Sequence, residues 1–195
     1  PRPTCYFLHG LVSHYPHQML PSGQQNGTLA TLPARYGGYW PVDQPSAVAQ
    51  QYQRHLLQVA FVDRLLGELV ARLKQNSLYD KALIVITADH GMSFTAGLPQ
   101  RNISNENAAE IMRVPLVIKY PDRLNVPPHV SDVNAEAIDI LPTVAHVLGL
   151  GLTRPIDGAS LLDPARPGRS SKVVLATAPG RRRNVDAKNL DLEPA

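Results

Sequence analysis

The chain has 195 residues, of which 44% are hydrophobic and 18% charged, and its formal net charge is +3. This length and composition are typical of one globular domain with a buried core. The sequence has no basic-aromatic pattern of a nucleic-acid-binding domain, no apolar run long enough to cross a membrane, and a single cysteine, which excludes an internal disulfide. The chain begins with proline rather than methionine, so we expect it to be a piece of a longer protein.

The first predicted element is a strand at residues 4–12, and Pro16 interrupts regular structure soon after it. Cys5 lies within this strand and is expected to be a small buried side chain. Three histidines lie close together here, at His9, His14 and His17. His9 is on the apolar strand, where a packed core histidine is expected, whereas the other two are in the loop that follows.

A loop rich in glycine and proline comes next, at residues 21–45, and a loop of this length within a domain is usually functional or forms a binding surface. Its apolar anchors are Tyr36, Tyr39 and Trp40. From 47 to 75, apolar residues recur at steps of three and four, which predicts a long amphipathic helix capped by Ser46. The predicted buried face consists of Tyr52, Leu56, Val59, Val62, Leu66, Leu69 and Leu73.

The segment 82–91 contains a continuous apolar run that is followed by Asp89, His90 and Gly91. Such a run predicts a strand buried on both faces, as in a parallel sheet, and ligands bind at the carboxyl ends of such strands. A carboxylate beside an imidazole offers two metal ligands, and glycine allows a sharp turn close to a ligand. On spacing alone, a helix cap followed by a surface histidine is an equally good interpretation.

The remaining segments alternate between loops, helices and strands. Pro142 predicts that a helix at 135–148 starts or kinks near Ile140, and Gly149 closes this helix. A polar tail at residues 179–195 is expected to be flexible. The other predicted elements are a loop at 92–107, a short helix or turn at 107–112, a buried strand at 114–120, a loop at 124–133 and a third strand at 172–176.

Several of these pieces, taken in order, resemble the carboxyl-terminal part of sulfatase-like enzymes of the alkaline phosphatase superfamily. The matching stretch runs from about Cys5 to Leu161, and residues 1–178 are assigned to this catalytic domain. The pieces are the His14-Tyr15-Pro16 element, the long helix, the strand followed by Asp89-His90-Gly91, the strand at 113–119, the run at 139–143 and the turn at 157–161. The resemblance implies an α/β fold with an alkaline-phosphatase-like, mixed or mostly parallel sheet sandwiched between helices, incomplete because its N-terminal part is missing here.

The resemblance also implies hydrolysis of sulfate esters with the help of a divalent metal, either Ca²⁺, Mn²⁺, Zn²⁺ or Mg²⁺. Asp89 and His90 match the metal-ligand pair of the family, and His14 matches a catalytic histidine that faces the sulfuryl or phosphoryl group. Esters of this kind react chiefly through positioning and charge stabilisation. Further candidates for binding the anionic sulfate or phosphate ester are His17, Arg101 and Lys119.

The nucleophile of the family, which is a formylglycine, a serine or a threonine, lies in an N-terminal part with no counterpart here. Cys5 lacks the C-x-P-S-R context of a formylglycine precursor, so we expect a missing segment to supply the nucleophile and this chain alone to be inactive. Three functions stay open: a sulfate ester hydrolase; a phosphatase or a phosphoryl, phosphoglycerol or phosphoethanolamine transferase; and a non-catalytic metal- or anion-binding remnant. Relatives often act outside the cytoplasm, so by resemblance the parent protein is expected to be extracytoplasmic or membrane-tethered through its upstream region.

Overall fold

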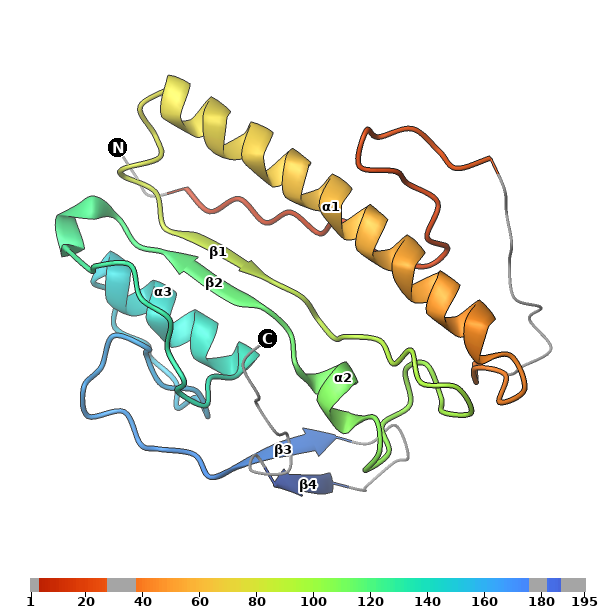
Figure 1. The fold of residues 1–195 in the computed structure, drawn as a ribbon. Helices are drawn as coiled ribbons and strands as arrows, with labels where there is room; N and C mark the ends of the chain where they lie inside the picture. Colours follow the sequence, from red (N-terminus) through yellow and green to blue (C-terminus); the bar gives the residue numbers. More distant parts are fainter. Residues whose placement is uncertain (1–3, 28–37, 176–181, 187–195) are drawn as a thin grey trace. The chain divides into compact units, whose positions relative to one another are not determined.

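The computed structural model describes residues 4–27, 38–175 and 182–186, so Tyr36 and Ala176 lie outside the described residues. The chain divides into two compact units. The helix unit contains residues 4–79 and 90–113, and the sheet unit contains residues 80–89 and those from 114 onward. Figure 1 labels the helices and strands of each unit.

Helix α1, Pro45–Gln75, dominates the helix unit and confirms the predicted long helix. It begins before the predicted cap, Ser46, because proline suits the first turn of a helix: its φ is already helical and its missing N–H needs no partner there. The last turn carries Arg72 and Lys74, whose positive charges favour the carboxyl end of a helix. The short helix α2, Ala108–Met112, confirms the short helix predicted at 107–112.

The buried face of α1 differs from the predicted apolar stripe. Its fully buried residues are Val48, Gln51 and Gln58. By contrast, Tyr52 and Leu56 of the predicted stripe are each 46% exposed. The burial of two glutamines means that α1 is held in this unit partly by polar contacts, which apolar periodicity does not reveal.

The side chain of Gln58 is the clearest of these polar contacts. Its oxygen accepts hydrogen bonds from the backbone N–H groups of Gln18 (2.7 Å) and Met19 (2.9 Å). Its amide nitrogen donates to the backbone carbonyl of His14 at 3.0 Å. A buried amide must find such partners, because an unpaired polar group away from water costs about 1–3 kcal/mol. Gln58 therefore ties the loop at 14–19 to the middle of α1.

Residues 4–12 are not a strand, contrary to the prediction. Tyr6 and Phe7 are 90% and 89% exposed. Cys5 and His9, which were expected to be buried, are exposed as well. A strand needs a neighbour that pairs its backbone groups and shields one face. Among the described residues no strand pairs with this segment, so its apolar side chains have nothing to pack against.

Strands β1, Ile84–Thr87, and β2, Leu116–Lys119, form an antiparallel ladder in the sheet unit and confirm two predicted strands. Ile84 pairs with Lys119 at one end of the ladder. The expected parallel, fully buried arrangement is wrong for this pair, whose side chains are mostly half-buried. An antiparallel pair can leave one face in contact with water, which agrees with this degree of burial.

Helix α3, Ile140–Leu148, starts where Pro142 predicts and ends at Gly149, whose φ of 66° is left-handed. Proline is tolerated in the first turn because the N–H groups there have no partner within the helix. The buried residues of α3 are Pro142, Thr143, Ala145 and Val147. Leu141, by contrast, is 57% exposed. The buried face is rotated toward Thr143, whose hydroxyl donates to the Asp139 carbonyl at 2.6 Å.

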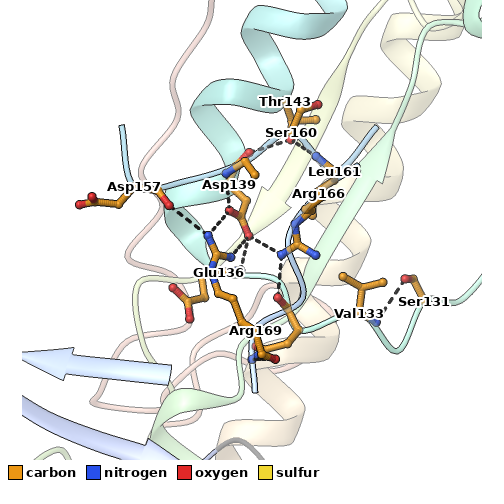
Figure 2. Close-up of polar contacts among 12 residues, drawn as sticks. Ser131, Val133, Glu136, Asp139, Thr143, Asp157, Ser160, Leu161, Arg166 and Arg169 are labelled. Carbon is orange, nitrogen blue, oxygen red and sulfur yellow. Dashed lines mark hydrogen bonds and ion pairs between the residues drawn. The ribbon is translucent and has the colours of Figure 1, made fainter. Parts of the chain in front are cut away.

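Asp139 itself is fully buried and is held by two arginines, as Figure 2 shows. Arg169 binds both of its carboxylate oxygens, at 2.6 and 2.8 Å, and Arg166 binds one of them at 2.9 Å. The backbone N–H groups of Glu136 and Ala159 donate to the same carboxylate at 3.0 and 2.9 Å. Burial alone would raise the pKa of Asp139, but these donors hold it well below its usual range. We call Asp139, Arg166 and Arg169 the Asp139 clamp.

Strands β3, Ser171–Leu175, and β4, Arg182–Asp186, form a second antiparallel pair in the sheet unit. β3 confirms the third predicted strand. β4 lies in the tail that was expected to be flexible, so residues 182–186 of that tail are regular structure. Across the described residues, no helix combines the length and apolarity that a membrane span requires.

Candidate functional site

Three predicted site residues, His14, His90 and Arg101, meet in the helix unit. His14 Nε2 lies 3.5 Å from Arg101 Nη1, although the two residues are 87 positions apart in the sequence. The other terminal nitrogen of the same guanidinium, Nη2, contacts His90 Nε2. His14 and Arg101 are exposed and His90 is half-buried, so a ligand from solution can reach them. We call these residues the His–Arg cluster.

The two imidazoles of this cluster have the same orientation. His14 Nδ1 lies 2.6 Å from the Tyr15 carbonyl oxygen, and His90 Nδ1 lies 2.7 Å from the Gly91 carbonyl oxygen. A carbonyl oxygen only accepts hydrogen bonds, so we assign the proton to Nδ1 in both rings. In the neutral rings each Nε2 then carries a lone pair that faces the Arg101 guanidinium. Two imidazole lone pairs therefore converge on one cationic group.

Gly91 fixes the position of His90. Its N–H donates to the Ile111 carbonyl of α2 at 2.7 Å. A Cβ atom at position 91 would lie 2.1 Å from the Glu110 carbonyl oxygen, which is too close for any other residue. Gly91 was predicted to allow a close approach to a ligand, and in the structure the group that it closely approaches is the backbone of α2.

Asn107 holds the loop that carries Arg101. It is fully buried, and its amide donates to the Pro99 carbonyl at 2.9 Å and to the Asn102 carbonyl at 3.1 Å. These two acceptors lie on either side of Arg101 in the sequence. The arginine is therefore presented by a loop with fixed backbone ends, and preorganised groups of this kind bind charge most effectively.

His17, another predicted site residue, lies in a buried aromatic group and not in the His–Arg cluster. It is 4% exposed, and its ring centroid lies 4.9 Å from that of His55, 5.7 Å from Tyr15 and 5.9 Å from Phe94. Burial, followed by the charges of His55 and His14, lowers its pKa from 6.5 to about 4. His17 is therefore neutral near pH 7, and its environment favours a packing role.

His55 is a packing partner that the sequence prediction missed. Burial lowers its pKa, and its ring lies 5.3 Å from Phe94 between centroids. A signal was present in the sequence: Gln51, His55 and Gln58 follow one another at steps of four and three. Polar residues at this spacing share one helix face, and two of the three are fully buried in the structure.

Asp89 and Lys119 belong to the sheet unit. Asp89 is exposed and follows β1 by two residues, so it lies just beyond the carboxyl end of that strand, as predicted. Lys119 ends β2, and its Nζ lies 3.2 Å from the Asp122 carboxylate and 3.5 Å from the Ala82 carbonyl oxygen. The charge of Lys119 is thus already balanced by a neighbour in its own unit.

A divalent metal in a protein needs several oxygen, nitrogen or sulfur ligands grouped around it. In the part of the chain that the structure describes, no three side chains of His, Cys, Asp or Glu are grouped so as to hold an ion. Asp89 offers carboxylate oxygens and His90 offers Nε2, which contacts the Arg101 guanidinium in this structure, so metal binding at this nitrogen requires Arg101 to move away from it. These are suitable ligands for Zn²⁺ or Mn²⁺, and the carboxylate also suits Mg²⁺ and Ca²⁺. The chemistry of these two side chains is therefore compatible with a divalent metal.

Proteins with similar sequences include sulfatases and a phosphatase-superfamily enzyme. The chain is 30% identical over 116 residues to the endo-4-O-sulfatase of Bacteroides thetaiotaomicron. The aligned region covers 58% of this chain and 22% of that protein. It is 33% identical over 110 residues to the multifunctional alkaline phosphatase superfamily protein PehA of Trinickia caryophylli, covering 56% of this chain and 21% of that one. The chain thus spans about one fifth of the length of these relatives.

A solved structure with a similar fold is the phosphonate monoester hydrolase SpPMH from Silicibacter pomeroyi. The TM-score is 0.54 at 29% sequence identity, and the match covers 64% of this chain and 25% of that chain. This likeness confirms the α/β, alkaline-phosphatase-like fold class expected for a partial domain. The family model described as Sulfatase matches residues 2–150, which is more than half of the chain. This chain therefore belongs to the sulfatase family.

Proposed function

We propose that this chain forms part of the active site of a divalent-metal-dependent sulfate ester hydrolase. The observation that carries the proposal is the His–Arg cluster, in which His14, His90 and Arg101 converge from three separate segments. Membership of the sulfatase family and the similarity to an endo-4-O-sulfatase support sulfate esters as substrates. The nucleophile is proposed to come from an N-terminal segment outside this chain.

Asp89 and His90 are the proposed metal ligands of this chain. When bound, the metal supplies positive charge to the ester oxygens and lowers the pKa of the nucleophilic hydroxyl. Arg101 donates its N–H groups to the sulfuryl oxygens, and a guanidinium is well suited to bind two oxygens of one anion at once. Arg101 is favoured over Lys119, which is paired with Asp122, and over His17, which is buried and neutral.

His14 is the proposed catalytic histidine. Its Nδ1 is held by the Tyr15 carbonyl, so Nε2 is the nitrogen that faces the substrate. In its protonated form, Nε2–H donates to the ester oxygen, and this proton passes to the leaving-group oxygen as the bond to sulfur breaks. Gln58, which binds the His14 carbonyl at 3.0 Å, keeps the residue in position.

A second candidate function is the hydrolysis or transfer of phosphate or phosphonate esters. SpPMH is named as a phosphonate monoester hydrolase, and YvgJ of Bacillus subtilis, which is 25% identical over 116 residues, is named as lipoteichoic acid synthase-like. The same His–Arg cluster suits a phosphoryl group, because both anions spread charge over equatorial oxygens. A third candidate, a non-catalytic anion-binding remnant, requires that the full-length protein lack a nucleophile.

The full-length protein that contains this chain tests the proposal. Replacing Asp89 by alanine should remove the bound metal and lower turnover of 4-nitrophenyl sulfate by more than about 100-fold, since a lost direct ligand costs more than the 10–100-fold typical of outer-sphere changes. Metal content is measured by mass spectrometry of the purified protein and folding by circular dichroism. Asp132→Ala is the matched control, because Asp132 is exposed and lies in the same unit. Undiminished turnover by the Asp89→Ala protein would contradict the assignment of Asp89 as a metal ligand.

The same experiment separates the candidate functions. Turnover of 4-nitrophenyl sulfate is compared with turnover of 4-nitrophenyl phosphate and of an aryl phosphonate monoester. A preference for the sulfate supports the leading proposal, whereas a preference for either phosphorus ester favours the second candidate. A folded, metal-loaded protein without activity on all three esters favours the remnant.

A further inference from the structure

The helix unit contains a pocket whose walls are almost entirely apolar. Its lining residues are Pro45, Val48, Ala49, Tyr52, Met92, Phe94, Ala96 and Glu110. Its volume is about 610 Å³, and ligand pockets in proteins usually measure about 300–1,000 Å³. One wall is the start of α1, and another is the loop that follows His90. The size and lining of the pocket suit an apolar organic group of moderate size.

Aromatic contacts hold the pocket walls in place. The Phe94 ring lies 5.2 Å from Tyr52 and is stacked on Trp40 at 5.6 Å, measured between centroids. Trp40 is 2% exposed, and its indole N–H donates to the Ser93 carbonyl at 2.5 Å. Phe94 is therefore held by ring contacts with the buried Trp40 and with Tyr52. A pocket with walls of this kind is largely formed before a ligand binds, which lowers the cost of binding.

The pocket is linked to the His–Arg cluster by the segment that follows His90. Gly91, which follows His90, is hydrogen-bonded to α2, and the next residue, Met92, lines the pocket. Glu110 supplies the backbone against which Gly91 packs and is also one of the residues that line the pocket. One residue is thus shared between the surroundings of His90 and the pocket lining.

We propose that this pocket receives the organic group of the ester, and that Glu110 makes it select neutral or cationic organic groups over anionic ones. The inference rests on the proposed function, because it takes the His–Arg cluster as the place where the ester anion binds. Glu110 is the one charged side chain among the eight lining residues. Its carboxylate accepts a hydrogen bond from the Thr95 hydroxyl at 3.1 Å, which holds it at the rim.

The chemistry of the lining explains the direction of selection. A carboxylate at the edge of an apolar wall repels an anionic group that enters the pocket, and such repulsion is a common source of specificity. The rings of Tyr52 and Phe94 attract a cationic group through their negative faces. A neutral aryl or alkyl group gains from burial alone.

The test uses the full-length protein and three aryl sulfates that differ only at the para position. The substituents are nitro, carboxylate and trimethylammonium, so the organic group is neutral, anionic or cationic. Because the substituents also change the acidity of the leaving phenol, the quantity compared is the ratio of kcat/KM for the anionic ester to that for each other ester, in the variant and in the wild type. In Glu110→Gln, whose side chain keeps an acceptor for Thr95, this ratio should rise about tenfold, the effect of removing one like charge a few ångströms away at partial exposure.

Glu106→Gln is the matched control, because Glu106 is an exposed acid near Glu110 in the sequence but outside the pocket lining. Tyr52→Ala removes apolar wall from a half-exposed position and should raise KM for the nitrophenyl ester several-fold more than KM for methyl sulfate. An unchanged charge preference in Glu110→Gln, or an equal effect of Tyr52→Ala on both esters, would overturn the inference. If another segment of the protein fills the pocket, Tyr52→Ala will affect both esters equally.

A binding measurement separates this inference from the proposed function. The affinities of 4-hydroxybenzoate and of 4-hydroxyphenyltrimethylammonium are measured by calorimetry, without any turnover. If sulfate esters are not hydrolysed but the cationic phenol binds more tightly and Glu110→Gln removes the difference, the pocket assignment stands and the proposed reaction fails. If sulfate esters are hydrolysed but neither phenol distinguishes the variant from the wild type, the pocket assignment fails alone.

Discussion

The two histidines of the His–Arg cluster are oriented by bonds to the backbone next to them. His14 and His90 each donate Nδ1–H to the carbonyl of the following residue, Tyr15 and Gly91. This bond fixes the ring and its tautomer without a second side chain, a task that a carboxylate performs in many metal sites. Both rings therefore present Nε2 to the same guanidinium, that of Arg101.

The buried His17 should make the stability of the fold depend on pH. The pKa of His17 is about 4 in the folded state and 6.5 in the unfolded state, so between these values the unfolded chain binds more protons. Stability contributed by neutral His17 is fully present above pH 6.5 and is lost as the pH falls toward 4. The loss should approach about 3 kcal/mol, the free energy that corresponds to this shift. Urea unfolding at several pH values between 4 and 7.5 measures it.

His17→Phe removes the titrating group from this aromatic surround while keeping a ring of similar size. The free energy of unfolding of this variant should depend less on pH between 6.5 and 4 than that of the wild type. His9→Phe, at an exposed position, should leave the wild-type slope unchanged. Equal slopes for wild type and His17→Phe would show that His17 does not carry the acid sensitivity.

At the scale of elements, the Asp139 clamp joins the start of α3 to the segment at 157–169. Asp139 is fully buried, and Arg169 binds it with two parallel hydrogen bonds. Removing one partner of a buried pair leaves charge without compensation and costs about 3–5 kcal/mol. Arg169→Met should therefore lower the free energy of unfolding by an amount near the lower end of this range, since Arg166 still contacts the carboxylate.

Two variants make this prediction specific. Arg169→Lys keeps the charge but not the paired geometry, so it should recover only part of the loss. Arg64→Met removes the exposed ion pair with Glu68, whose partners are 46% and 60% exposed, and should cost no more than about 1 kcal/mol. The measurement is urea unfolding at pH 7. Equal effects of Arg169→Met and Arg64→Met would show that the clamp contributes no more than a surface pair.

Features with a local cause were predicted correctly, whereas the pairing of strands and the burial of helix faces, which depend on distant partners, were in part predicted wrongly. The start of α3 near Ile140 follows from Pro142, and its end follows from Gly149. The segment 4–12 has the apolar pattern of a strand, but a strand forms only with a partner. The buried face of α1 was predicted wrongly because Gln51 and Gln58 are buried there, and Gln58 binds backbone groups of the loop at 14–19.

At the scale of the whole molecule, the site combines residues that the sequence could identify with others that it could not. The resemblance to the sulfatase family pointed to His14 and His90, and charge pointed to Arg101. No local pattern places Arg101 against both histidines, because the contact spans 87 positions. The pocket residues were missed for the same reason: Tyr52 was assigned to a buried stripe of α1, and Glu110 had no motif around it.

Cys5 is not expected to be the nucleophile of the active site to which this chain contributes. Cys5 is exposed and lies outside any regular element, without the context of a formylglycine precursor. In the full-length protein, Cys5→Ala should therefore keep turnover of 4-nitrophenyl sulfate within about twofold of wild type, as a surface substitution away from the site does. Peptide mass mapping should find an unmodified thiol at Cys5 and any formylglycine in a different segment. An aldehyde at Cys5, together with a large loss of activity in a folded Cys5→Ala protein, would place the nucleophile within this chain and contradict the proposal that another segment supplies it.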